Sequence, residues 1–202
     1  MFDTRLRPVI DPPLDWAARR IVALPISANA ISIAGLAVGA VAAAAIVAGA
    51  FGAALAAILL NRLSDGLDGA VARLRGPSAL GGYYDIVFDF LFYGAVPLAF
   101  ALHDPPANAL PAAVLLAAFY ANGATFLAFA ALASQRGLTT SAQGRKAIYY
   151  FAGLAEGAET VAVFVLMTLV PSWFGTLAYA FAALCFLSAA ARILAVRAVL
   201  AG

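Results

Sequence analysis

Four aspartates between positions 65 and 89 are the residues of this chain best suited to chemistry. Asp65 and Asp68 are spaced i, i+3, and Asp85 and Asp89 are spaced i, i+4. Either spacing places both side chains of a pair on one face of a helix. Carboxylate oxygens are hard ligands that favour Mg²⁺ or Mn²⁺. Two such ions would balance four carboxylates and would clamp the attacking and leaving oxygens of a phosphoryl transfer.

The residues that follow the first pair suit a flat, charged ligand. Gly69 and Ala72 share the helix face of Asp65 and Asp68, and their small size lets a ligand approach the backbone. Arg73 comes next, and its planar guanidinium fork matches a diphosphate. Taken singly, these are ordinary packing residues and a cytoplasmic anchor charge. Together with the aspartates, they indicate a site for a metal-bound diphosphate.

The elements that must position these residues are membrane helices. Of the 202 residues, 65% are hydrophobic and only 11% are charged, and the mean hydropathy is +0.97. Because a soluble domain is about a quarter charged, this composition excludes a disordered chain, a coiled coil and nearly every water-soluble fold. The net charge of +2 suggests no nucleic-acid partner. We therefore expect a single all-α integral membrane domain over residues 1–202.

Apolar segments and their breaks predict six transmembrane helices, over about 27–48, 52–72, 82–102, 109–134, 147–169 and 174–195. Gly49 and Gly52 bracket the first turn. Residues 12–22, opened by Pro12 and Pro13, are expected to form an amphipathic helix at the membrane interface. Gly35-xxx-Gly39 is a candidate surface for close helix packing.

The basic residues predict the orientation of these helices. All 12 Lys and Arg fall at the N-terminus, near the connection of spans 2 and 3, in the connection of spans 4 and 5, or near the C-terminus. With six spans, these segments share one side of the membrane. The positive-inside rule then places both termini and the two Asp pairs in the cytoplasm.

The Asp-containing string resembles the signature of the CDP-alcohol phosphatidyltransferases, D-x2-D-G-x2-A-R-x8-G-x3-D-x3-D. All eight fixed residues are present, as Asp65-x2-Asp68-Gly69-x2-Ala72-Arg73 followed by Gly81-x3-Asp85-x3-Asp89. The spacer between Arg73 and Gly81 has seven residues, one fewer than in the signature. Using Gly82 instead would restore that spacer and shorten the next one, which leaves open which glycine meets the nucleotide. The chain is most similar to a short bacterial branch of the family with no assigned acceptor.

This resemblance implies an activity and a set of roles. The activity is transfer of a phosphatidyl group from CDP-diacylglycerol, or a related CDP-linked lipid, to a polar alcohol, with release of CMP. The implied cofactors are two divalent cations, Mg²⁺ or Mn²⁺, and the general base is Asp89. The implied metal ligands are Asp65, Asp68, Asp85 and Asp89, and the implied CDP contacts are Asp65, Asp68, Gly69, Ala72, Arg73 and Gly81. It also implies a homodimer in the bacterial inner membrane, with its active site facing the cytoplasm.

Charged residues further along the chain are candidates for binding the acceptor alcohol. Arg136, Arg145 and Lys146 lie on the same predicted side as the Asp pairs and suit glycerol 3-phosphate or another phosphorylated polyol. Glu156 and Glu159 would instead suit an amino alcohol, since carboxylates within a membrane are usually functional. Both sets also have a structural interpretation, as cytoplasmic anchors and as hydrogen-bonded struts.

Two other classes fit parts of the pattern. A UbiA-type prenyltransferase also binds a diphosphate through Mg²⁺ and Asp-rich helices, but its two motifs lie in separate repeats and Gly69, Ala72 and Arg73 have no role in it. A small transporter would need polar groups across the whole membrane, whereas these charges collect mainly on one predicted side. The released product separates the two enzymes, because one releases CMP and the other pyrophosphate.

Overall fold

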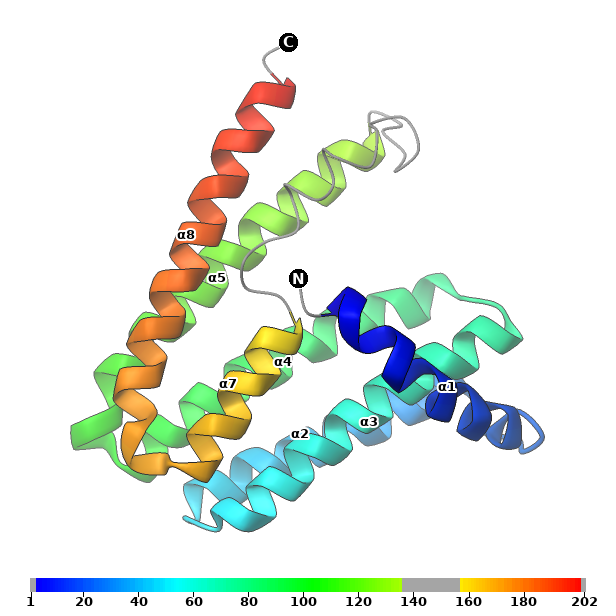
Figure 1. Ribbon diagram of the computed structural model, residues 1–202, viewed down its shortest axis with the longest axis horizontal. Helices are drawn as coiled ribbons and strands as arrows, with labels where there is room; N and C mark the ends of the chain where they lie inside the picture. The colour runs from blue at the N-terminus through cyan, green and yellow to red at the C-terminus, as the bar shows by residue number, and fades with distance from the viewer. Residues whose placement is uncertain (1–2, 136–156, 201–202) are drawn as a thin grey trace.

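The computed structural model describes residues 3–135 and 157–200, and these ranges are helical, with no strand. The elements are α1 (Asp3–Ile21), α2 (Ala28–Val47), α3 (Phe51–Arg75), α4 (Ala79–His103), α5 (Pro105–Gln135), α7 (Gly157–Leu169), a 3-10 turn (Pro171–Trp173) and α8 (Phe174–Leu200). Figure 1 shows α2 running alongside both α3 and α4, while α5 and α8 form a pair that extends away from them. The expected all-α class is confirmed.

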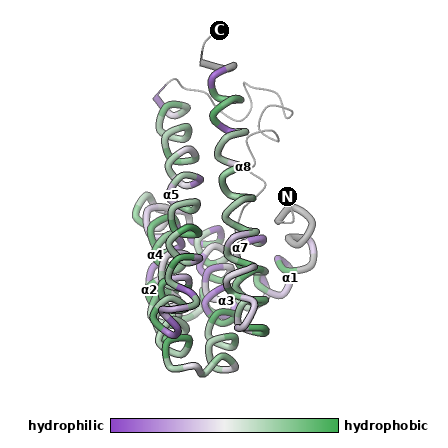
Figure 2. The backbone as a smooth tube through the Cα atoms, turned by 90° about the vertical axis from the view of Figure 1, so that its left-hand side faces the viewer, coloured by the Kyte–Doolittle hydropathy of each residue, from purple (hydrophilic) through white to green (hydrophobic). Residues whose placement is uncertain are grey.

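Four segments are long and apolar enough to cross a membrane: α2, α4, α5 and Pro171–Arg197. Figure 2 shows that hydrophobic residues dominate α5 and α8 along their length. Exposed leucines such as Leu110, Leu187 and Leu194 suit contact with lipid. The helix α7 is apolar but shorter, and α3 carries the first Asp pair and several arginines. The count of six spans and the cytoplasmic termini stay predictions.

Two glycines in the left-handed region form the turns on either side of α3. Gly49 adopts φ 74° between α2 and α3, and Gly76 adopts φ 98° between α3 and α4. Such backbone angles favour glycine because it has no Cβ to clash. Ser78 then begins α4 by accepting a hydrogen bond from the Gly81 amide at 3.0 Å. The short connection makes α3 and α4 antiparallel, so the two Asp pairs lie at the same end of the hairpin.

The N-terminal helix starts earlier than the sequence pattern predicts. Our expectation of a helix opening at Pro12 was wrong, since α1 begins at Asp3 and contains Pro8, Pro12 and Pro13. The fixed φ of proline, about −65°, is compatible with a helix, but an interior proline also removes a backbone hydrogen bond and crowds the preceding turn, which weakens or bends the helix.

The helix α1 packs against α3 through a small apolar cluster made of Leu14, Ala18, Ala70 and Val71. Gly66 makes this contact possible, because a Cβ at that position would lie 2.7 Å from Leu14 Cδ1. The N-terminal helix α1 therefore lies against the same helix that carries Asp65 and Asp68.

The predicted contact surface on α2 is confirmed. Gly35 and Gly39 are buried, and a Cβ at Gly39 would lie 3.0 Å from Phe92 of α4 and 3.2 Å from Asn61 of α3. The small residues thus let α2 approach both helices of the Asp hairpin. The larger core beyond them joins α4, α5, α7 and α8 through packed aromatic rings.

Candidate active site

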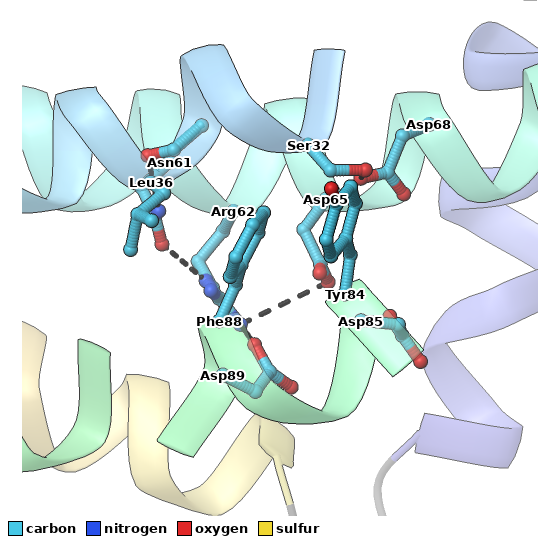
Figure 3. Close-up of a pocket in the computed structure, with 11 residues that line it drawn as sticks. Ser32, Leu36, Asn61, Arg62, Asp65, Asp68, Tyr84, Asp85, Phe88 and Asp89 are labelled. Carbon is cyan, nitrogen blue, oxygen red and sulfur yellow. Dashed lines mark hydrogen bonds and ion pairs between the residues drawn. The ribbon is translucent and has the colours of Figure 1, made fainter. Parts of the chain in front are cut away.

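One pocket between α2, α3 and α4 brings all four aspartates together (Figure 3). Its lining comes from α2 (Ser32, Gly35, Leu36), α3 (Asn61, Arg62, Asp65, Asp68) and α4 (Tyr84, Asp85, Phe88, Asp89). The cavity measures about 20 Å³, which is room for about one water molecule or a small ion. A nucleotide is far larger than this cavity, so only its charged groups could reach into it.

Asp68 is held from the neighbouring helix α2. The Ser32 hydroxyl donates to Asp68 Oδ2 at 2.5 Å, and the Asp68 residue is 9% exposed. Our sequence analysis did not single out Ser32. Its only local signal is a hydroxyl one turn into an apolar helix, and such hydroxyls usually bond to their own backbone.

Asp89 is held on both of its carboxylate oxygens. Arg62 donates from Nη1 to Asp89 Oδ1 at 2.8 Å, and the Tyr93 hydroxyl donates to Oδ2 at 3.2 Å. The same Arg62 nitrogen lies 3.8 Å from Asp65 Oδ2. Arg62 also donates from Nε to Asn61 Oδ1 at 2.8 Å. Arg62 therefore lines the pocket together with the four aspartates.

The donors fit a divalent cation by type. Four carboxylates and a serine hydroxyl supply only oxygen atoms, which hard cations prefer. As placed, however, the described residues include no group of three or more His, Cys, Asp or Glu side chains that could hold a metal ion. Metal binding would therefore require these side chains to move closer together.

Of the expected CDP contacts, Asp65 and Asp68 line the pocket, whereas Gly69, Ala72, Arg73 and Gly81 lie outside its lining. Arg73 pairs with Asp15 of α1, with 3.2 Å between Nη2 and Oδ1, and both side chains are about half exposed. Gly69 is open, since a Cβ there would meet only the Arg73 side chain at 3.7 Å. Gly81 is crowded by Ser78 and Asn29, whereas Gly82 faces open space.

Of the candidate acceptor residues, only Glu159 falls within the structure described here. Arg136, Arg145, Lys146 and Glu156 lie outside the described residues. Glu159 is half-buried in the first turn of α7. That turn approaches the pocket, because a Cβ at Gly157 would lie 3.3 Å from the Tyr93 hydroxyl.

The fold and the pocket define an all-helical membrane protein with an acidic site between neighbouring helices. The chain belongs to the CDP-alcohol phosphatidyltransferase family, whose model matches residues 25–194. It is therefore a transferase of phospholipid biosynthesis, in a family that generally depends on divalent cations. This membership replaces the prenyltransferase and transporter alternatives.

Two known proteins resemble the chain over most of its length. The "Inner membrane protein YnjF" of Escherichia coli (strain K12) is 44% identical over 193 residues, which cover 96% of this chain and 94% of that protein. The crystal structure of Mycobacterium tuberculosis phosphatidylinositol phosphate synthase (PgsA1) with CDP-DAG bound matches with a TM-score of 0.73 and 20% identity, over 91% of this chain and 93% of that one. Because the identity to the synthase is only 20%, that similarity concerns the fold alone. Together with the apolar helices, the similarity to the Escherichia coli protein supports a multi-pass inner membrane protein.

Proposed function

We propose that this protein transfers a phosphatidyl group from CDP-diacylglycerol, or a related CDP-linked lipid, to the hydroxyl of a small polar alcohol, and releases CMP. The observation that carries the proposal is the single pocket in which the four aspartates of the family signature meet. The CDP-DAG bound to the structurally similar synthase supports the choice of donor.

Asp65, Asp68, Asp85 and Asp89 would hold two divalent cations, Mg²⁺ or Mn²⁺. When bound, such ions neutralise a diphosphate and stabilise the charge that develops on the leaving oxygen. Asp89 would accept the proton of the acceptor hydroxyl. The freed oxygen would form a bond to the phosphorus that carries the lipid, and CMP would leave with the electrons of the broken P–O bond. Arg73 would bind the diphosphate after leaving Asp15.

The acceptor is a phosphorylated polyol, such as glycerol 3-phosphate, in our first proposal, because Arg136, Arg145 and Lys146 supply three cations. An amino alcohol is the alternative, in which Glu156 and Glu159 bind its ammonium group. The second choice is supported by the first turn of α7, since Gly157 lies beside Tyr93, and Tyr93 donates to Asp89. An amino alcohol bound by the first turn of α7 would thus lie next to Asp89, the proposed general base.

The proposed setting is a single domain with six spans, in which α3 and α7 cross the membrane with the four longer apolar segments. The active site and both termini would face the cytoplasm, where CDP and small alcohols are found. A homodimer is expected from the family resemblance.

Release of CMP from CDP-diacylglycerol by the purified protein in lipid tests the proposal. The panel contains glycerol 3-phosphate, inositol phosphate, serine, ethanolamine, choline and phosphatidylglycerol, with Mg²⁺ or Mn²⁺. We expect metal-dependent CMP release with one acceptor, its loss in Asp89→Asn and its retention in Asp104→Asn. Asp104 is a suitable control because it is an exposed aspartate outside the pocket lining, where it accepts a hydrogen bond from the Ala107 amide in the first turn of α5. Folded protein that releases no CMP with any of these acceptors would contradict the proposed transfer to them.

A further inference from the structure

Arg62 places a permanent positive charge inside the acidic pocket. Its side chain is 17% exposed, and its Nη1 atom lies 2.8 Å from Asp89 and 3.8 Å from Asp65. The family signature begins at Asp65 and assigns no residue at this position. Before any metal binds, the pocket therefore contains four carboxylates and one built-in cation.

The guanidinium group is fixed by neutral partners as well as by its ion pair. Asn61 accepts a hydrogen bond from Arg62 Nε at 2.8 Å, and its own amide donates to the Gly35 carbonyl at 2.7 Å. The guanidinium carbon lies 4.8 Å from the ring centre of Phe92 and 5.7 Å from that of Tyr93. Such stacking favours a cation over each ring. Arg62 is therefore fixed in this position by a hydrogen bond and ring stacking as well as by its ion pair with Asp89.

The four carboxylates differ in how many protein donors they already meet. Asp89 accepts hydrogen bonds on both oxygens, from Arg62 and Tyr93, and Asp68 accepts one from Ser32. Within residues 3–135 and 157–200, the Asp85 carboxylate has no hydrogen bond or ion pair. Asp65 has only the longer ion pair to Arg62, at 3.8 Å. Asp65, Asp68 and Asp85 therefore meet fewer or longer protein contacts than Asp89, whose two oxygens both accept hydrogen bonds.

We infer that Arg62 is the resident counter-ion of Asp89 and that a second divalent cation must displace it. The inference rests on the proposed metal-dependent transfer. A first ion would use the open oxygens of Asp65, Asp68 and Asp85. A second ion needs Asp89, so it competes with two hydrogen bonds and is also repelled by the guanidinium charge. The two ions therefore bind with unequal affinities, and Arg62 sets the difference between them.

Calorimetric titration of the purified full-length protein with Mn²⁺, without donor or acceptor, measures this difference directly. We expect two binding steps in the wild type. Arg62→Met removes the charge and keeps an apolar stem against Phe92, so the second step should tighten by about ten- to a hundredfold, the usual weight of a charged hydrogen bond. Tyr93→Phe removes one donor from Asp89 and should tighten the second step by about two- to tenfold.

Arg75→Met is the matched control for the loss of one charge from α3. The Arg75 guanidinium donates to the carbonyls of Val22, Leu24 and Ile26 and contacts no carboxylate of the pocket. Both binding steps should stay at wild-type values in this variant. An equal tightening in Arg62→Met and Arg75→Met would overturn the inference, because the effect would then be one of net charge.

The inference is also overturned if Arg62→Met leaves the second step unchanged or abolishes it. Should that variant not fold, Arg62→Gln decides, since glutamine also removes the charge but keeps a polar group beside Asn61 and Asp89. A tighter second step supports the inference, and an unchanged one overturns it.

CMP release by the same preparations separates the two proposals. If CMP release depends on metal but the Mn²⁺ binding steps of the Arg62 variant equal those of the wild type, only the role of Arg62 is overturned. If the wild type neither binds Mn²⁺ nor releases CMP, both proposals are overturned.

Discussion

Arg62 is partly buried and Arg192 is buried, and these two arginines lie in different halves of the molecule and form different contacts. Arg62 of α3 meets the carboxylate of Asp89. Arg192 of α8 is 5% exposed and donates from Nη1 to neutral oxygens of α5, at 2.9 and 3.0 Å on Asn122 and 2.8 Å on Thr125. A charge within membrane helices is a functional candidate by default. The comparison refines this rule, because the hydrogen bonds of Arg192 to Asn122 and Thr125 link α8 to α5, whereas the ion pair of Arg62 with Asp89 lies within a pocket of carboxylates.

The comparison predicts that the largest losses of activity come from the α3–α4 pocket. Asp89→Asn should lower the rate of CMP release by about 10²–10⁴-fold, the range for loss of a positioned general base. The melting temperature should change little, because the Asn oxygen can still accept from Arg62. Rates and thermal unfolding of Asp89→Asn and Asp104→Asn, measured side by side, check this. A melting temperature that collapses together with the rate would make Asp89 a structural residue as well.

Arg192→Met tests the other half of the comparison. Removing the charged donor leaves the Asn122 carbonyl and the Thr125 hydroxyl without it, so we expect a loss of about 2–3 kcal/mol in stability. The measurement is thermal unfolding in detergent, with the rate of CMP release normalised to folded protein. A large rise in the acceptor KM at an unchanged melting temperature would break the comparison, since Arg192 would then belong to the binding site.

The close packing of α2 against the pocket helices gives a smaller effect. Gly39→Val would force atoms against Phe92 and Asn61, and we expect a loss of about 1–3 kcal/mol from overpacking. Gly52→Ala is the matched control, because a Cβ there meets no atom within 4 Å. It should change the free energy of unfolding by less than about 1 kcal/mol, because Gly52 lies in the first turn of α3 and the full preference of alanine over glycine applies to helix interiors. Equal effects of the two variants on the melting temperature would contradict the assigned α2 contact.

The exposed pair of Arg73 and Asp15 should contribute least to stability. Asp15→Asn is expected to change the free energy of unfolding by less than about 1 kcal/mol, because both side chains reach solvent. If Arg73 binds the donor diphosphate, freeing it from Asp15 should lower the KM for CDP-diacylglycerol. Unfolding curves and donor titrations of the variant distinguish the two effects. A strong loss of stability would show that this pair fixes α1 to α3.

Local patterns in the sequence predict the parts of the site that follow from helix periodicity. The i, i+3 and i, i+4 spacings of the aspartates and the small Gly35 and Gly39 contact surface depend only on about 3.6 residues per turn. The turn glycines follow from the same local reasoning, and Gly49 does adopt a positive φ. The length of α1 was not predictable in this way, because its prolines read as a helix start.

The partners of the charged groups were decided by the tertiary structure. From sequence alone, Arg62 has Asp65 as its i, i+3 neighbour, yet its shorter contact is to Asp89, which lies 27 residues further along the chain. Ser32 reaches Asp68 over 36 residues in the same way. The sequence by itself determined the membrane setting, the Asp pairs and the family, because composition and spacing within one helix require no knowledge of its neighbours. Only the packing of α2, α3 and α4 determined which carboxylate meets a cation, a hydroxyl or an open cavity, because distances between helices depend on how their surfaces fit together.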